Sequence, residues 1–161
     1  MFEIGDKIVY PMHGAGVIEA IEEREILGEV RQYFVLKMPI GEMRVLVPVS
    51  TVGQIGLRRI IQKDALDSVF EILGKRQDLD KDNWNQRYRN NLEKLKSGSV
   101  YELAEVVRNL ACRDQEKGLS TGEKKMFDNA RQLLLSELVL VMEGREEVVI
   151  GRIEACLTSY A

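Results

Sequence analysis

The sequence predicts an α+β fold, in which a small antiparallel β-barrel precedes a compact all-helical domain. Two observations support this prediction. Up to about residue 60, short alternating runs of apolar and polar residues are broken by glycine and proline, which is typical of a small barrel or a strongly bent sheet. Beyond residue 60, apolar residues recur at helical spacing. We therefore expect two domains, residues 1–60 and 61–161, in this chain of 161 residues.

The first region contains four strand-like segments. Residues 8–10 form an apolar run that a proline ends, and residues 17–21 alternate. A turn is expected at 27–29, before a second alternating segment at 33–37. Residues 43–49 alternate again, so the region predicts an antiparallel sheet of short strands.

The second region predicts five helices. Their expected ranges are 64–73, 83–96, 100–117, 121–143 and 146–158. Four glycines each follow a helix-like stretch, where a residue with positive φ would end the helix: Gly74, Gly98, Gly118 and Gly144. The charged segment 75–82 lacks apolar periodicity and is expected to be a loop.

Serines open two of these helices. Ser99 with Glu102, and Ser120 with Glu123, have the spacing of a capping box, in which the serine hydroxyl and the glutamate carboxylate satisfy backbone N–H groups. Asp64 is a weaker start signal for the first helix.

Composition excludes several classes of protein. With 45% hydrophobic residues the chain is too apolar for a disordered tail. Its longest apolar run, residues 138–142, is far below the roughly 18 residues that span a bilayer. The first residues lack a basic segment followed by an apolar core, so a cytoplasmic protein without a secretory signal is expected.

Residues suited to catalysis or metal binding are scarce. Cys112 and Cys156 lie in apolar helical patterns and are expected to be free thiols, although one disulfide stays open. His13 is the sole histidine, so we expect no zinc site and no other metal. Residues 14–16 resemble part of a phosphate loop but lack its Lys-Ser/Thr pair. We expect no cofactor and no enzymatic activity, because no nucleophile–base pair is visible.

The charge distribution is uneven. The net charge is -3 and the pI about 5.4, which argues against binding nucleic acid by bulk charge. Between residues 83 and 96, however, there are four bases and one acid. The bases are Arg87, Arg89, Lys94 and Lys96. A second basic group, Arg113, Lys117, Lys124 and Lys125, surrounds a later helix junction. Both groups are either ordinary solvated helix faces or anchors for phosphates.

Trp84 is the single tryptophan of the chain and lies in the first turn of its predicted helix. Asn83 and Asn85 flank it, and Tyr88 follows on the same helical face. It either packs into the helical core or remains exposed, where an aromatic ring could stack on a nucleic-acid base or wedge into a minor groove.

Motifs along nearly the whole chain resemble those of the CarD/CdnL family of bacterial transcription regulators. In the β region they are Gly5-Asp6-Lys7-Ile8-Val9-Tyr10-Pro11, His13-Gly14-Ala15-Gly16 and Ile21-Glu22. In the helical region they are Asn83-Trp84, Arg87-Tyr88, Leu95-Lys96-Ser97-Gly98, Ala104-Glu105-Val106-Val107-Arg108, Arg113 to Ser120 and Gly122-Glu123-Lys124. The β region alone also resembles the polymerase-binding module of transcription-repair coupling factors.

The resemblance implies a Tudor/SH3-like barrel that docks on the β subunit of RNA polymerase. It further implies a helical domain that contacts promoter DNA through the minor groove without reading sequence. The residue matching Trp84 would wedge into DNA at the upstream edge of the melted bubble and stabilise the open complex. We expect a monomer that associates with the nucleoid through polymerase and has no membrane contact.

The resemblance also assigns residues to each partner. Arg24 matches a basic position that contacts polymerase, and Leu46 matches a position that is basic in some relatives. Arg44, two residues before Leu46, shares its strand face and is expected to supply the charge. The DNA contacts are expected from Trp84, Arg87, Arg89, Lys94, Lys96, Lys124 and Lys125. An alternative is an adaptor that docks on polymerase alone and has no DNA role.

Overall fold

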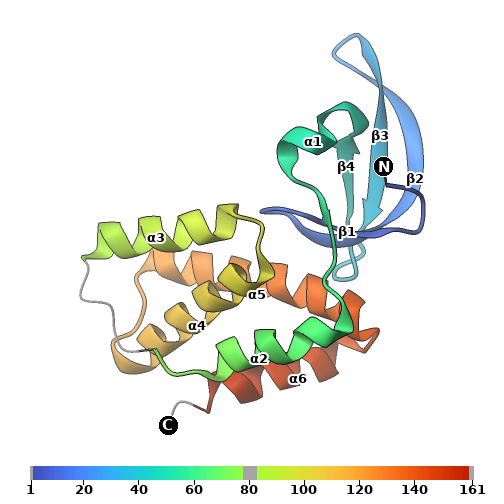
Figure 1. The fold of residues 1–161 in the computed structure, drawn as a ribbon. Helices are drawn as coiled ribbons and strands as arrows, with labels where there is room; N and C mark the ends of the chain where they lie inside the picture. Colours follow the sequence, from blue (N-terminus) through green and yellow to red (C-terminus); the bar gives the residue numbers. More distant parts are fainter. Residues whose placement is uncertain (1, 78–82, 160–161) are drawn as a thin grey trace.

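In the computed structural model, which describes residues 2–77 and 83–159, a five-stranded antiparallel sheet is followed by a group of helices (Figure 1). The predicted α+β class is confirmed. The strands are β1 (Lys7–Tyr10), β2 (Gly14–Ile26), β3 (Glu29–Lys37), β4 (Arg44–Pro48) and β5 (Arg58–Arg59). Their order in the sheet is β4-β3-β2-β1-β5, so consecutive strands pair from β1 to β4 and β5 adds to the free side of β1.

A long hairpin connects β2 and β3. Leu27 and Gly28 form its turn with φ values of 54° and 81°, and this left-handed pair matches the twist of the flanking strands. The predicted turn at 27–29 is therefore confirmed. Near the other end of the hairpin, the register shifts between Ile18 and Ala20, which leaves Glu19 in a bulge.

Six α-helices and two 3-10 turns occupy the rest of the described chain. They are η1 (Val49–Thr51), α1 (Val52–Ile55), η2 (Lys63–Ala65), α2 (Leu66–Gly74), α3 (Trp84–Lys96), α4 (Val100–Glu116), α5 (Thr121–Met142) and α6 (Glu146–Leu157). The five predicted helices correspond to α2 through α6. Of the predicted loop 75–82, residues 75–77 are non-helical and residues 78–82 lie outside the described residues.

The helix ends agree only partly with prediction. Gly98 and Gly118 have φ values of 77°, as expected for residues that end helices. Gly74, by contrast, is the last residue of α2, and at the end of α5 the positive φ of 51° belongs to Glu143 rather than to Gly144. These two glycine predictions were wrong. Gly74 belongs to α2 itself, and at the end of α5 the residue that adopts the left-handed conformation is Glu143.

Serine residues cap the N-termini of α4 and α5, as the sequence predicted. Ser120 and Glu123 form a reciprocal capping box at α5, whereas Ser99 only accepts a hydrogen bond from the Glu102 N–H at α4. Asp64 does not open α2. It lies inside η2, and the N-cap residue Ala65 makes no side-chain hydrogen bond.

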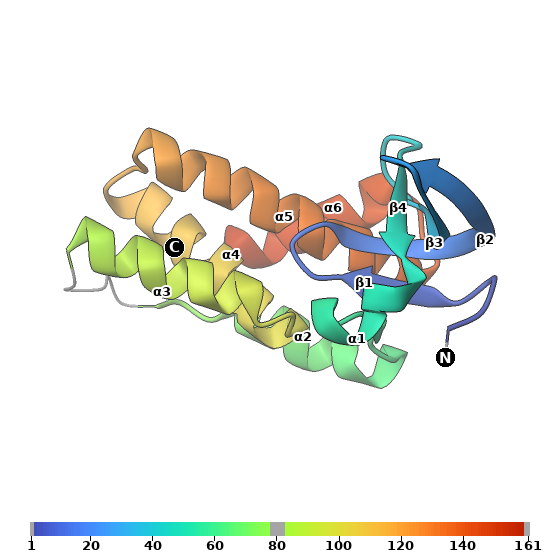
Figure 2. The same ribbon diagram turned by 90° about the horizontal axis from the view of Figure 1, so that it is seen from above.

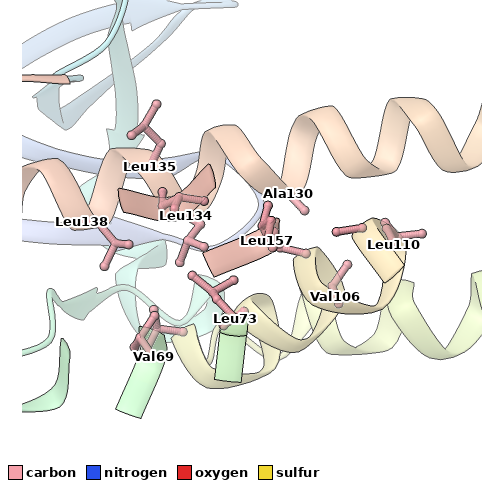
Figure 3. Packing of buried hydrophobic residues seen from close by; sticks show 14 of the residues in the cluster. Val69, Leu73, Val106, Leu110, Ala130, Leu134, Leu135, Leu138 and Leu157 are labelled. Atoms are coloured by element: carbon pink, nitrogen blue, oxygen red, sulfur yellow. The ribbon is translucent and has the colours of Figure 1, made fainter. Parts of the chain in front are cut away.

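Two hydrophobic clusters form the interior. In the sheet region Ile8, Ile18, Phe34, Leu36, Met38 and Val47 are buried together. In the helical region α4 is central and contacts α2, α3, α5 and α6 (Figure 2). Figure 3 shows how Val69, Leu73, Val106, Leu110 and Leu134 meet between these helices. Helix α6 docks on this core through Val149, Ile153 and Leu157.

The two cysteines are free thiols. Cys112 is buried and Cys156 is half-buried. Burial raises the pKa of the Cys156 thiol, so its reactive thiolate form is disfavoured at neutral pH. Within the described ranges, every helix is too short or too polar to cross a membrane.

A buried carboxylate joins the sheet to the helices. Glu137 on α5 is 1% exposed and accepts two hydrogen bonds of 2.8 Å from the guanidinium of Arg58 on β5. The Ile61 N–H donates to the same carboxylate at 2.9 Å, and Arg58 Nε donates to the carbonyl of Gly98 at 2.7 Å. Three segments distant in sequence thus meet at one ion pair.

A second contact brings β2 directly against α5. The Ala15 N–H donates to the hydroxyl of Ser136 at 2.9 Å. A Cβ on Gly14 would lie 3.0 Å from that hydroxyl, and Gly14 itself has a φ of 111°. Both the close approach and the backbone conformation require glycine here.

We expect Arg58→Ala to lower the free energy of unfolding by about 3–5 kcal/mol, because it leaves the Glu137 carboxylate buried without its partner. The measurement is urea unfolding followed by circular dichroism. The control is Arg59→Ala, which removes a surface ion pair with Asp6 and should cost less than about 1 kcal/mol. Equal losses from both variants would contradict a structural role for the buried pair.

Candidate nucleic-acid interface

Trp84 lies at the end of the helical domain that is remote from the sheet. Helix α3 begins with Trp84, and its N-terminal end points away from the strands in both Figure 1 and Figure 2. Its other end is held near the sheet, because Gly98 receives the hydrogen bond from Arg58 and lies close to Pro11. The tryptophan is therefore presented at a distance from the region that resembles a polymerase-binding module.

The Trp84 side chain is neither a core residue nor a free ring. It is 41% exposed and stacks on Tyr88 with a centroid distance of 5.1 Å and an interplanar angle of 20°. Its indole Nε1–H donates to the hydroxyl of Ser120 at 2.9 Å. A Cβ built on Gly122 would lie 3.6 Å from the indole edge, an ordinary van der Waals distance, so the first turn of α5 lies beside the ring.

Beneath the tryptophan, two arginines surround a buried glutamate. The Glu123 side chain is 3% exposed, and its carboxylate lies 3.7 Å from Arg87 Nε and 3.9 Å from Arg113 Nε. The same carboxylate accepts from the Ser120 hydroxyl at 3.2 Å. The cluster thus joins α3, α4 and the start of α5 below the indole.

The predicted DNA-contacting arginines have different environments. The Arg87 side chain is only 12% exposed and faces Glu123, so its guanidinium lies within the protein, where a phosphate does not reach without rearrangement. Arg89 is exposed and makes no ion pair with any other described residue. Of the two, Arg89 is the one whose side chain is exposed.

The predicted lysines divide between the two ends of α3. Lys124 and Lys125 are exposed in the first turns of α5, near Trp84. Lys94 and Lys96 lie toward the opposite end of α3. The offset from Trp84 to Lys96 is 12 positions, which corresponds to about 18 Å of helix. Lys94 also pairs with Glu105 at 2.6 Å.

The N-termini of α3 and α5 meet at Trp84. Asn83 caps α3 by accepting from the Gln86 N–H at 2.9 Å, and Ser120 caps α5. Helix N-termini carry partial positive charge, and these two lie together at one end of the helical region, with the exposed Lys124 and Lys125 in the first turns of α5. A chain with an acidic balance can therefore hold a locally positive site.

Sequence reasoning missed Ser120, Gly122 and Glu123 as members of this site. It gave Arg113 only as part of a basic group on a solvated helix face or anchoring phosphates, whereas its side chain faces the buried Glu123. The capping box of Ser120 with Glu123 was visible in the sequence. The contact of Ser120 with Trp84, which lies 36 positions earlier, could not be predicted, because no local sequence pattern indicates which helix N-termini pack together.

The residues predicted to contact polymerase share one face of the sheet. Leu46 pairs with Val35, Arg44 with Lys37, and Arg24 with Arg31. Since Arg31, Val35 and Lys37 alternate along β3, their side chains and those of their partners point to the same side. The offset from Arg31 to Lys37 is six positions, so this sheet face extends over about 20 Å between Arg24 and Arg44.

Both arginines predicted to contact polymerase have acidic neighbours. Arg24 pairs with Glu22 at 2.8 Å, and Arg44 pairs with Glu19 at 2.7 Å and 3.0 Å. The hydrogen bond from Arg44 lowers the pKa of the Glu19 carboxyl, and the same carboxylate raises the pKa of Arg44. Leu46 is half-buried between the two charged positions.

No group of three or more His, Cys, Asp or Glu side chains among the described residues is arranged to hold a metal ion. The candidate site consists of an aromatic ring, exposed basic side chains and two helix N-termini.

Comparison with known proteins identifies the family. The family model described as "CarD-like/TRCF RID domain" matches residues 2–61 of the chain. The family model described as "CarD, C-terminal domain" matches residues 68–154. A protein of Bacillus subtilis (strain 168), named "Putative transcription factor YdeB", is 46% identical over 141 residues, which covers 88% of this chain and 92% of that protein. The chain belongs to the CarD family.

Membership of the CarD family confirms the resemblance seen in the motifs and makes the chain a transcription regulator in the broad sense. The Tudor-like fold of the CarD-like/TRCF RID domain corresponds to the five-stranded sheet. Both descriptions and the relative's name refer to transcription proteins rather than to enzymes.

The Arg44–Glu19 pair can be tested by titration. We expect Glu19 to titrate below its ordinary pKa, and Arg44→Gln to return that pKa to the ordinary range. Since the folded-state pKa is lowered, the pair contributes stability above the unfolded-state pKa and loses it as pH falls through the lowered value. Carbon-13 NMR of the side-chain carboxyl measures this. A Glu19 pKa that Arg44→Gln leaves unchanged would contradict the pairing.

Proposed function

We propose that this chain binds the β subunit of RNA polymerase through its sheet face and stabilises the promoter open complex through its helical domain. In this proposal residues 1–60 act as the polymerase-binding domain and residues 61–161 as the DNA-contacting domain. The DNA contacts are independent of sequence and lie at the upstream edge of the melted bubble. Family membership and the placement of Trp84 support the proposal.

The observation that carries the proposal is the half-exposed Trp84 ring at the meeting point of two helix N-termini. Stacking on a base is worth about 1–3 kcal/mol and is insensitive to the identity of the base. Arg89 on α3 and Lys124 and Lys125 in the first turns of α5 are exposed and suit phosphate contacts, which position a protein on DNA without reading sequence.

The sheet face supports the other half of the proposal. Arg24 and Arg44 hold exposed ion pairs on the sheet face that also carries the half-buried Leu46, an arrangement that a partner with matching acidic and apolar groups could cover. The β subunit as partner is inferred from the CarD-like/TRCF RID match at residues 2–61.

Tethering explains how weak DNA contacts suffice. Once the sheet is bound to polymerase, contact with DNA becomes intramolecular, at an effective concentration that the two-domain geometry sets. The open complex is favoured only to the extent that the protein binds it more tightly than the closed complex. A difference of about 1.4 kcal/mol changes the ratio tenfold.

Replacing Trp84 tests the wedge. We expect Trp84→Ala to reduce the open-to-closed ratio by about tenfold, because it removes about 1–3 kcal/mol of stacking. Promoter melting with purified polymerase, reported by a fluorescent base in the bubble, gives the ratio. Tyr101→Ala is a matched control, because Tyr101 is a helical aromatic residue that is also 41% exposed. Equal activity of Trp84→Ala and the parent would show that the wedge role is wrong.

Charge reversals separate the two partners. Arg24→Glu with Arg44→Glu should reduce capture by polymerase by at least tenfold, whereas Arg145→Glu, an exposed reversal outside the sheet face, should not. Arg89→Glu with Lys125→Glu should leave capture intact and weaken open-complex formation. If open-complex formation is indifferent to this second pair, the protein-only adaptor gains support. Arg87 is unsuitable for reversal because its side chain faces the buried Glu123.

A further inference from the structure

We propose that Ser120 is a positioning residue for Trp84, so that the capping box of α5 fixes the orientation of the indole that α3 presents. This inference rests on the proposed function for its consequence at DNA. The orientation of the ring in the free protein is a separate property and can be measured without polymerase or DNA.

The hydroxyl of Ser120 has one donor and two acceptor positions, and all three are used. It donates to the Glu123 carboxylate at 3.2 Å, and it accepts from the Glu123 N–H at 3.2 Å and from the Trp84 indole N–H at 2.9 Å. Donation to the carboxylate directs the hydroxyl proton toward Glu123. Both lone pairs are then available to the two N–H groups.

Neighbouring side chains hold this hydroxyl in place. Glu123 is buried, and the guanidiniums of Arg87 and Arg113 lie within 3.7 Å and 3.9 Å of its carboxylate. At these distances the contacts are ion pairs rather than hydrogen bonds, and the close packing around a buried side chain restricts changes of its rotamer. The inward orientation of Arg87 therefore gains a role: it orients Glu123, which orients Ser120.

The indole is held by two contacts. Tyr88 covers part of one ring face, and the hydrogen bond to Ser120 fixes the N–H side. Stacking on Tyr88 alone would still permit the ring to slide and rotate about its broad χ2 torsion. The directional hydrogen bond removes that freedom. The exposed part of the ring is then held in one orientation, ready to stack on a base of the DNA.

Trp84 is the single tryptophan, so its fluorescence reports on this site alone. In Ser120→Ala we expect faster local depolarisation of Trp84 emission and an approximately threefold to tenfold loss of open-complex stabilisation, the effect of one neutral hydrogen bond. Ser120→Thr keeps the hydroxyl and should behave like the parent in both measurements.

Ser99→Ala is the matched control for loss of a helix cap. Ser99 caps α4 as Ser120 caps α5, but its hydroxyl has no contact with the tryptophan. It should lower thermal stability, by less than Ser120→Ala does because Ser99 makes a single cap hydrogen bond of 3.4 Å, while leaving Trp84 depolarisation and open-complex formation unchanged. If Ser99→Ala reproduces the open-complex loss, capping rather than positioning is the cause, and the proposal is overturned.

Trp84→Phe provides the converse test. It keeps a ring over Tyr88 but removes the N–H donor and part of the stacking surface, so it should lose at least as much open-complex stabilisation as Ser120→Ala. The double variant Trp84→Phe/Ser120→Ala should lose no more than Trp84→Phe alone, because both substitutions remove the same hydrogen bond. Additive losses would overturn the proposal.

The two readouts distinguish failure of this inference from failure of the proposed function. Unchanged depolarisation in Ser120→Ala means that Ser120 does not hold the ring, whatever the promoter assay gives. A second outcome is faster depolarisation in Ser120→Ala while neither Ser120→Ala nor Trp84→Ala alters open-complex formation. This result would support the positioning role of Ser120 and refute the DNA role of the tryptophan.

Discussion

The carboxylate of Glu137 determines how the two halves of this protein are joined. It is buried on α5, and it accepts hydrogen bonds from the Arg58 guanidinium and from the Ile61 N–H. Burial of one charge in this position would be costly, and the bidentate arrangement with three donated hydrogen bonds offsets that cost. Because Arg58 also binds the carbonyl of Gly98, the same guanidinium holds the C-terminal end of α3. The direction in which α3 points from the sheet follows from this contact.

The acidic balance of the chain and its proposed contact with DNA are compatible. The net charge of -3 disfavours binding to free DNA, since phosphate contacts supply most nonspecific affinity. The exposed Lys124 and Lys125 lie in the first turns of α5, whose N-terminus meets that of α3 at Trp84. A regulator of this kind would contact DNA where polymerase delivers it and would not be held along the rest of the genome.

Most of the fold could be predicted from the sequence because its signals are local. Alternation identified the long strands, and apolar spacing with serine caps identified α2 through α6. The two-residue strand β5 and the single-turn helix α1 have too few residues to show a period, so the sheet contact that carries Arg58 was not predicted. At the candidate site, Trp84 was identified because it is the single tryptophan of the chain and basic residues follow it along the same helix. The inward orientation of Arg87 could not be predicted, because it depends on Glu123, a residue 36 positions later that packs against it only in the folded chain. The resemblance assigned Arg87 to phosphate by position, and position alone does not report burial.

Helix α5 carries both ends of the arrangement. Its N-cap Ser120 binds the tryptophan, and Ser136 and Glu137 bind the sheet. The offset from Ser120 to Ser136 is 16 positions, about 24 Å of helix. Removal of one residue between them would shorten this spacing by about 1.5 Å and also rotate one contact by about 100° relative to the other. The segment can therefore vary in sequence on its exposed side during evolution, but its length is constrained by helical phase: only insertions or deletions close to whole turns would keep both contacts on their present faces.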